Sequence, residues 1–106
     1  MLHFRSSRFT AEPVTVPVPG VLVVEGCGSS PRALHPWTTL RLWVEAPAGL
    51  RLERGLARDG VGLEPEWRRW LVTEAAEFAR EDTRRRADLR VDGTRGGDEG
   101  DVVLLP

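Results

Sequence analysis

The sequence lacks several residue types, and each absence excludes a kind of chemistry. It contains no lysine, asparagine, glutamine, isoleucine or tyrosine, so every basic side chain apart from histidine is an arginine. Without lysine, these residues supply neither a phosphate-loop lysine nor a Schiff-base lysine. The single cysteine, Cys27, excludes a disulfide within the chain and indicates a reduced, cytosolic setting. We interpret the use of arginine alone first as a GC-rich coding bias and only second as function.

The bulk composition indicates one small globular domain. The chain has 106 residues, 41% of them hydrophobic, and a net charge of -1, which argues against a nucleic-acid partner. No stretch approaches the roughly 18 apolar residues of a membrane span, and the first residues lack the apolar core of a signal peptide. His3 and His35 with one cysteine make no metal-ligand pattern. We therefore expect a soluble, cytoplasmic protein without a metal site, and neither a membrane nor nucleic acid as a partner.

Short apolar runs predict strands of an α/β fold. Val21–Glu25 and Leu40–Ala46 are typical of strands buried on both faces, the kind found in parallel sheets. Leu89–Val91 predicts a third strand and Val102–Leu105 a last one. Ligands bind at the carboxyl ends of parallel strands, so the acid and glycine after the first run mark a candidate site. The expected layout is an extended segment over 1–20, the main domain over 21–93, and a glycine-rich loop with a strand over 94–106.

Two helices are predicted between the second and third strands. The first covers Ala48–Arg58, with Asp59 and Gly60 as its stop, and the second covers Pro65–Arg84. A stripe of apolar residues at helical spacing along the second helix predicts a core face: Trp67, Trp70, Leu71, Ala75, Phe78 and Ala79. Residues 26–37 are expected to form a loop with a short helical turn, and Val14–Val18 at best an edge strand.

Three arginines on the first helix form a candidate anion site. Arg51, Arg54 and Arg58 have the spacing i, i+3, i+7, which places them within about 60° on the helix surface. Three guanidinium groups on one face suit phosphate oxygens. The alternative is a solvated charged face softened by Glu53 and Asp59, and the spacing alone favours this alternative.

The first apolar run ends at Glu25, and Gly26 and Cys27 follow it. Glu25 could hold a metal through water or contact a substrate hydroxyl, and Gly26 would let a ligand approach the backbone. The alternative is simple punctuation between a strand and a turn, and the sequence leaves both open. A nucleophilic Cys27 would need an activating base, for which His35 is the only neighbour in sequence, so we interpret Cys27 as a small buried filler.

The order of these motifs resembles the C-terminal half of a P-loop nucleoside kinase of the uridine kinase-like family. The likeness extends over about residues 9–93. The matching runs are Glu25-Gly26, then Trp43-Val44-Glu45-Ala46-Pro47, then Arg51-Leu52-x-Arg54-x-x-x-Arg58-Asp59, then Trp67-x-x-Trp70-x-x-x-Glu74, and last Ala87-Asp88-Leu89-Arg90-Val91-Asp92-Gly93.

The resemblance implies roles for these residues in ATP- and Mg-dependent phosphoryl transfer to a nucleoside hydroxyl. Arg51, Arg54 and Arg58 would stabilise charge on the transferring group, and Asp59 would orient them. By the same resemblance, Glu25 and Gly26 would contact the substrate. The adenine pocket would lie near Asp88, Asp92 and Gly93.

The sequence departs from this family in one decisive respect. It contains no Gly-x-x-x-x-Gly-Lys-[Ser/Thr] loop, whose amides and lysine hold the phosphates. The expected fold is therefore a partial P-loop NTPase-type parallel sheet with flanking helices and without its central phosphate-loop strand. We expect a fragment or truncated reading frame that is inactive alone and binds no ATP by itself. The open strand edges would allow it to form a homodimer. The alternative functions are a non-enzymatic protein-interaction module and an anion-binding module.

Overall fold

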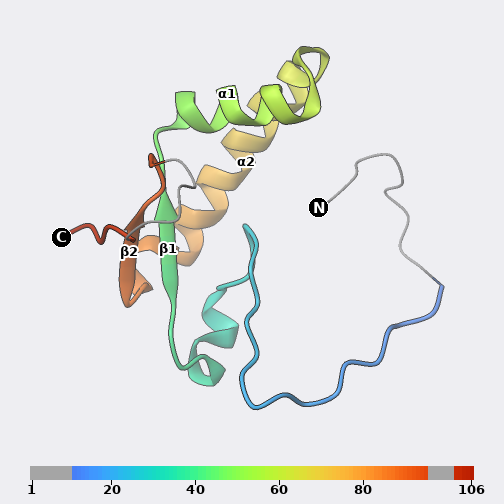
Figure 1. The fold of residues 1–106 in the computed structure, drawn as a ribbon, viewed down its shortest axis with the longest axis vertical. Coiled ribbons are helices and arrows are strands. Elements are labelled where there is room, and N and C mark those ends of the chain that lie inside the picture. Colours follow the sequence, from blue (N-terminus) through green and yellow to red (C-terminus); the bar gives the residue numbers. More distant parts are fainter. Residues whose placement is uncertain (1–10, 96–101) are drawn as a thin grey trace.

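The computed structural model describes residues 11–95 and 102–106 and has a small α/β fold (Figure 1). Two parallel strands form its sheet, and two long helices connect them. No helix among the described residues has the length and apolar character needed to cross a membrane. In chain order the elements are η1 (Arg32–Trp37), β1 (Leu42–Glu45), α1 (Ala48–Asp59), η2 (Val61–Leu63), α2 (Glu64–Glu81), α3 (Thr83–Arg86) and β2 (Leu89–Asp92).

The sheet pairs β1 with β2 in parallel, from Leu42 opposite Leu89 to Glu45 opposite Asp92. One face of β1 packs on α2, because Trp43 meets Phe78 edge to face with ring centroids 4.7 Å apart. The strand predicted over Leu40–Ala46 is thus confirmed with shorter bounds, and so is the predicted third strand. The prediction that this strand is buried on both faces is wrong, because Leu42 and Val44 are exposed on the face away from α2. The expected α/β class with a parallel strand pair is confirmed as well.

The C-terminal residues add an antiparallel contact to β2. Leu104 forms a bridge with Val91, and the Leu105 amide donates to the Arg90 carbonyl at 2.8 Å. The strand predicted over Val102–Leu105 is therefore a single bridge rather than a full strand.

The two long helices meet at a glycine. Gly55 of α1 is the one buried residue in the part of the chain that the structure describes. A Cβ atom there would lie 2.5 Å from the ring of Trp67 on α2, so only glycine allows this close approach. Helix α1 ends at Asp59, and Gly60 caps it with a φ of 103°, a backbone conformation that favours glycine, as the predicted stop requires.

The second helix is shorter than predicted. It ends at Glu81, and Asp82 adopts a left-handed backbone with φ 52° before α3 begins. Aspartate tolerates this conformation better than most residues, and its carboxylate pairs with Arg85 at 3.0 Å. The prediction of one continuous helix to Arg84 was therefore wrong in its last turn.

The strand predicted over Val21–Glu25 is wrong. These residues form no strand, and the exposed fractions of Val21 to Val24 run from 64% to 81%. An apolar run becomes a buried strand only when a neighbouring strand satisfies its backbone, and no described strand pairs with this one. Val14–Val18 likewise forms no strand.

The predicted apolar core is only half formed. No apolar side chain within residues 11–95 and 102–106 is fully buried. On α2 the half-buried face contains Trp67, Leu71, Glu74 and Phe78, whereas Trp70, Ala75 and Ala79 of the predicted stripe are exposed. The short helical turn predicted within residues 26–37 is present as η1.

Candidate functional site

Two of the three predicted arginines lie at the carboxyl end of the parallel strands. Arg51 donates from Nε to the carbonyl of Ala46, directly after β1, at 3.1 Å. Arg54 donates to two carbonyls directly after β2, Gly93 at 2.6 Å and Thr94 at 3.1 Å. The first turns of α1 therefore hold both guanidinium groups at the edge where ligands bind in parallel sheets.

The charge of Arg51 is compensated within the chain. Its Nη1 forms an ion pair with Glu74 of α2, whose side chain is only 9% exposed. Arg54 differs, because among the described residues it pairs with no carboxylate. Within residues 11–95 and 102–106, Arg54 is thus the arginine at this edge whose guanidinium binds neutral carbonyls alone.

Arg58 lies apart from the other two arginines. It binds Asp59 in a two-pronged ion pair of 2.9 and 3.0 Å, and its guanidinium lies over the Trp67 ring at 5.7 Å. Trp67 donates its indole N–H to the same carboxylate at 3.1 Å. The hydrogen bonds from Arg58 hold the pKa of Asp59 below its ordinary value. Seven residues of helix separate Arg58 from Arg51 by about 10 Å, so the three arginines do not form one fork.

This arrangement decides the role of Asp59. Its carboxylate contacts Arg58 and Trp67, and neither Arg51 nor Arg54 is among its partners in the described residues. Asp59 joins the end of α1 to α2, and it positions one arginine rather than three.

Glu25 and Gly26 lead into a turn beside α2. The Ser29 amide donates to the Gly26 carbonyl at 3.2 Å, and Gly26 has a φ of 141°. Glu25 is exposed. The turn brings the Cys27 thiol close to Glu74 and Arg51.

Cys27 is exposed, not the buried filler that the sequence predicted. Partial desolvation, followed by the negative charge of Glu74, raises the pKa of its thiol. A raised pKa keeps the thiol protonated and unreactive at neutral pH. None of these contacts activates the Cys27 thiol as a nucleophile.

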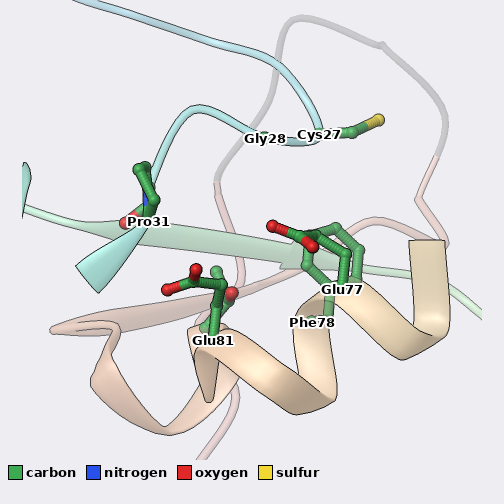
Figure 2. Close-up of a pocket in the computed structure, with 8 residues that line it drawn as sticks. Cys27, Gly28, Pro31, Glu77, Phe78 and Glu81 are labelled. Carbon is green, nitrogen blue, oxygen red and sulfur yellow. The ribbon is translucent and has the colours of Figure 1, made fainter. Parts of the chain in front are cut away.

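A small hollow lies between this turn and the second half of α2 (Figure 2). Figure 2 shows Glu77, Phe78 and Glu81 on the helix below the turn that carries Cys27 and Gly28. The space is about 10 Å³, at the lower limit for one water molecule. Two carboxylates beside so small a space exclude it as a phosphate site.

The residues predicted near an adenine pocket lie at two ends of β2. Asp92 is the last residue of β2 and Gly93 follows it, at the edge where Arg54 lies, and Asp92 accepts from the Thr94 hydroxyl at 2.6 Å. Hydrogen bonds from Thr94 lower the pKa of Asp92. Gly93 is needed there, because a Cβ atom would lie 2.9 Å from the Glu45 carbonyl oxygen.

Asp88 lies at the other end of β2. It accepts from the Arg41 backbone N–H at 2.7 Å and from the Arg41 guanidinium at 3.1 Å. The Arg41 amide is the main cause of its lowered pKa. A strand of four residues separates Asp88 from Asp92 by about 13 Å, so one pocket does not use both.

Two acids were missed by sequence reasoning. Glu74 faces Arg51 from within the half-buried stripe of α2, and a lone acid at helical spacing among apolar residues was the available signal. Glu45 accepts from Arg84 at 2.7 Å and from the Trp43 indole at 2.8 Å, which lowers its pKa. The contact between Glu45 and Arg84 spans 39 residues, and no local pattern indicates it.

No protein-family model, curated protein or solved structure matches this chain. The site is therefore interpreted from its own geometry. Within the described residues, no three histidine, cysteine, aspartate or glutamate side chains gather to hold a metal ion. What the arrangement offers is an arginine edge, defined here as Arg51 and Arg54 with the backbone of Ala46, Gly93 and Thr94.

Proposed function

We propose that this chain is part of a phosphotransferase domain related to the nucleoside kinases, and that its arginine edge faces the phosphates. The observation that carries the proposal is Arg54. Its guanidinium lies at the carboxyl end of the parallel strands and is held by two neutral carbonyls. A cation that pairs with no carboxylate among the described residues, at the edge where ligands bind, suits a phosphate oxygen.

The three arginines have different roles in this proposal. Arg54 contacts the phosphate and stabilises negative charge that develops on it. Arg51, already paired with Glu74, fixes the start of α1 against β1 and so positions Arg54. Arg58 and Asp59 join α1 to α2 and have no contact with the ligand.

The described residues do not provide a complete catalytic site. They bring no metal-ligand cluster together, and the sequence has no lysine and no glycine-rich phosphate loop. ATP, Mg²⁺ and a nucleoside are therefore ligands of the proposed family, and no step through them is assigned to these residues. We expect the chain alone to bind phosphate groups weakly and to transfer none.

Binding of pyrophosphate tests the proposal directly. Isothermal titration should detect weak binding to the parent chain, and Arg54→Gln should weaken it by about tenfold or more, the effect of one charge-assisted hydrogen bond. Arg68→Gln is the matched control, since Arg68 is an exposed arginine on α2 paired with Glu64 and far along the chain from the edge. Equal binding by the parent and Arg54→Gln would show that the arginine face is merely solvated.

An activity assay tests the claim of incompleteness. The chain is mixed with ATP, Mg²⁺ and a panel of nucleosides, and formation of nucleoside monophosphate is measured. We expect no turnover above the buffer background. Robust turnover by the chain alone would overturn this part of the proposal.

A protein-interaction module is the second candidate, and one observation favours it. Leu42 and Val44 of β1 are 57% and 64% exposed, and the apolar run Val21–Val24 is exposed as well. Exposed apolar surface of this kind marks interaction sites, including a second copy of the chain at an open strand edge. Size-exclusion chromatography with light scattering tests it: a monomer at all concentrations that binds no apolar dye would refute this candidate.

A further inference from the structure

His35 lies at the contact between η1 and the end of the α2–α3 helical region. Its Nδ1 atom is 3.2 Å from Nη1 of Arg86, and its carbonyl accepts from Nη1 of Arg41 at 3.3 Å. Arg86 also donates from Nη2 to the carbonyl of Ser30 and from Nε to that of Glu81, at 2.8 Å for the latter. We name His35, Arg86, Ser30 and Arg41 the histidine latch.

The latch joins segments that are distant in sequence. Arg86 and Ser30 are 56 residues apart, and Arg86 and His35 are 51 apart. The Arg32 amide adds a further link, since it donates to the Glu81 carboxylate at 2.8 Å. Figure 1 shows η1 near the end of α2 that leads to β2. These hydrogen bonds hold η1 where no buried apolar side chain does so.

The contact with Arg86 requires a neutral imidazole. A guanidinium group has only donors, so the Nδ1 atom of His35 must accept, and the ring proton lies on Nε2. A doubly protonated imidazolium has no acceptor left. Protonation would therefore remove this hydrogen bond and place two cations in contact.

The charges around His35 come from four other places in the fold. Arg86 belongs to α3, Arg41 precedes β1, Glu81 ends α2 and Asp88 precedes β2. Asp88 is the carboxylate that favours an imidazolium, but it is already engaged by the backbone N–H and the guanidinium of Arg41.

The two carboxylates of this cluster are held in their ionised form by hydrogen bonds. Backbone hydrogen bonds, from Arg41 to Asp88 and from Arg32 to Glu81, hold both pKa values below the ordinary range. Histidine side chains change charge between about pH 5 and 8. Over that range both carboxylates stay ionised, and histidine is the one side-chain type in this cluster that can change its charge.

We propose that the histidine latch is a pH-sensitive switch, closed when His35 is neutral and released when His35 is protonated. Release removes the contact of the His35 ring with Arg86 and loosens the segment from Ser29 to Thr38, which then keeps only the hydrogen bonds that do not use the imidazole. The sheet and the contact of α1 with α2 do not involve His35 and stay in place. The inference is independent of the proposed function, because no residue of the arginine edge takes part.

Hydrogen exchange measured by NMR tests the switch in the full chain. We expect the protection factors of the Arg32 and Thr38 amides, corrected for intrinsic exchange, to fall about tenfold between pH 7.5 and pH 5.5. Amides of α1 serve as the internal reference and should not change. Flat protection in η1, or protection that rises on acidification, would overturn the proposal.

Two variants assign the effect to His35. The amide oxygen of His35→Gln accepts from Arg86 at every pH, so its protection should be independent of pH. His35→Ala has no acceptor, and its protection should be low at both pH values, with circular dichroism confirming that the helices persist. His3→Gln removes the only other histidine and should keep the parent's pH dependence. A pH dependence that survives in His35→Gln would refute the latch.

Discussion

The approach of α1 to α2 at Gly55 permits a prediction of opposite sign to the usual one. Glycine inside a helix normally costs about 0.5–1 kcal/mol relative to alanine, so Gly→Ala usually stabilises. At Gly55 the added Cβ would lie 2.5, 2.6 and 2.9 Å from three ring atoms of Trp67, which is closer than real contacts allow. Overpacking of this kind costs about 1–3 kcal/mol. We therefore expect Gly55→Ala to reduce the free energy of unfolding by about 1 kcal/mol net.

Gly49→Ala is the matched control in the same helix. A Cβ atom at Gly49 meets nothing within 4 Å, so this variant should gain up to about 1 kcal/mol from helix propensity. Urea unfolding followed by the helical circular dichroism signal measures both variants. Trp67→Leu should relieve the clash, so the cost of Gly55→Ala should shrink in that background.

One result would refute this reasoning. If Gly55→Ala is as stable as Gly49→Ala, the helices do not touch at Gly55. The packing of α1 against α2, which sets the direction of the arginine helix, would then be wrong.

Three further predictions concern contacts around the arginine edge and the sheet. Arg51→Gln leaves the nearly buried Glu74 carboxylate without its ion-pair partner and should lower the free energy of unfolding by about 1–3 kcal/mol. The double variant Arg51→Gln/Glu74→Gln should recover part of this loss. Urea unfolding measures both variants. An undiminished stability of Arg51→Gln would contradict the ion pair. Phe78→Ala removes the ring that meets Trp43, so it should lower the free energy of unfolding by about 2–3 kcal/mol and change the near-ultraviolet circular dichroism spectrum. An unchanged spectrum would refute the aromatic contact. The pKa values of Asp88, Asp92 and Glu81 are lowered in the folded chain, so these carboxylates contribute their full free energy of stabilisation above about pH 4.5. This contribution is lost as the pH falls through the lower folded-state pKa values. The midpoint of urea unfolding should therefore drop in acid, and it should drop less in Asp88→Asn. A midpoint independent of pH below 4.5 would show that these hydrogen bonds are absent.

Local patterns predicted the elements that depend on local signals. The helix after Pro47 and its end at Gly60 follow from a fixed proline φ and a glycine with φ 103°, and both are in place. The strand at Leu42–Glu45 was predicted from its apolar run and is present because β2 pairs with it.

The predictions that depend on distant partners fared differently. Val21–Glu25 has a strand-like composition, yet strand formation requires a hydrogen-bonded neighbour that the described residues do not supply. The break at Asp82 depends on a backbone conformation that no apolar period encodes.

The candidate site shows the same division. Helical spacing placed Arg51, Arg54 and Arg58 on one face, and that spacing is real. It could not show that Glu74 pairs with Arg51, that Asp59 pairs with Arg58, or that Arg54 binds the carbonyls of Gly93 and Thr94. Those distinctions come from residues 1 to 40 positions away along the chain, which an i, i+3, i+7 pattern does not contain.

The central claim is that the arginine edge faces phosphate, and one NMR experiment tests it most directly. Pyrophosphate is titrated into the isotope-labelled chain, and the amide shifts are mapped on the sequence. We expect shifts concentrated at residues 46–55 and 93–95, which are lost in Arg54→Gln and kept in Arg68→Gln. Shifts centred instead on the basic run Arg84–Arg86, or no shifts at all, would contradict it.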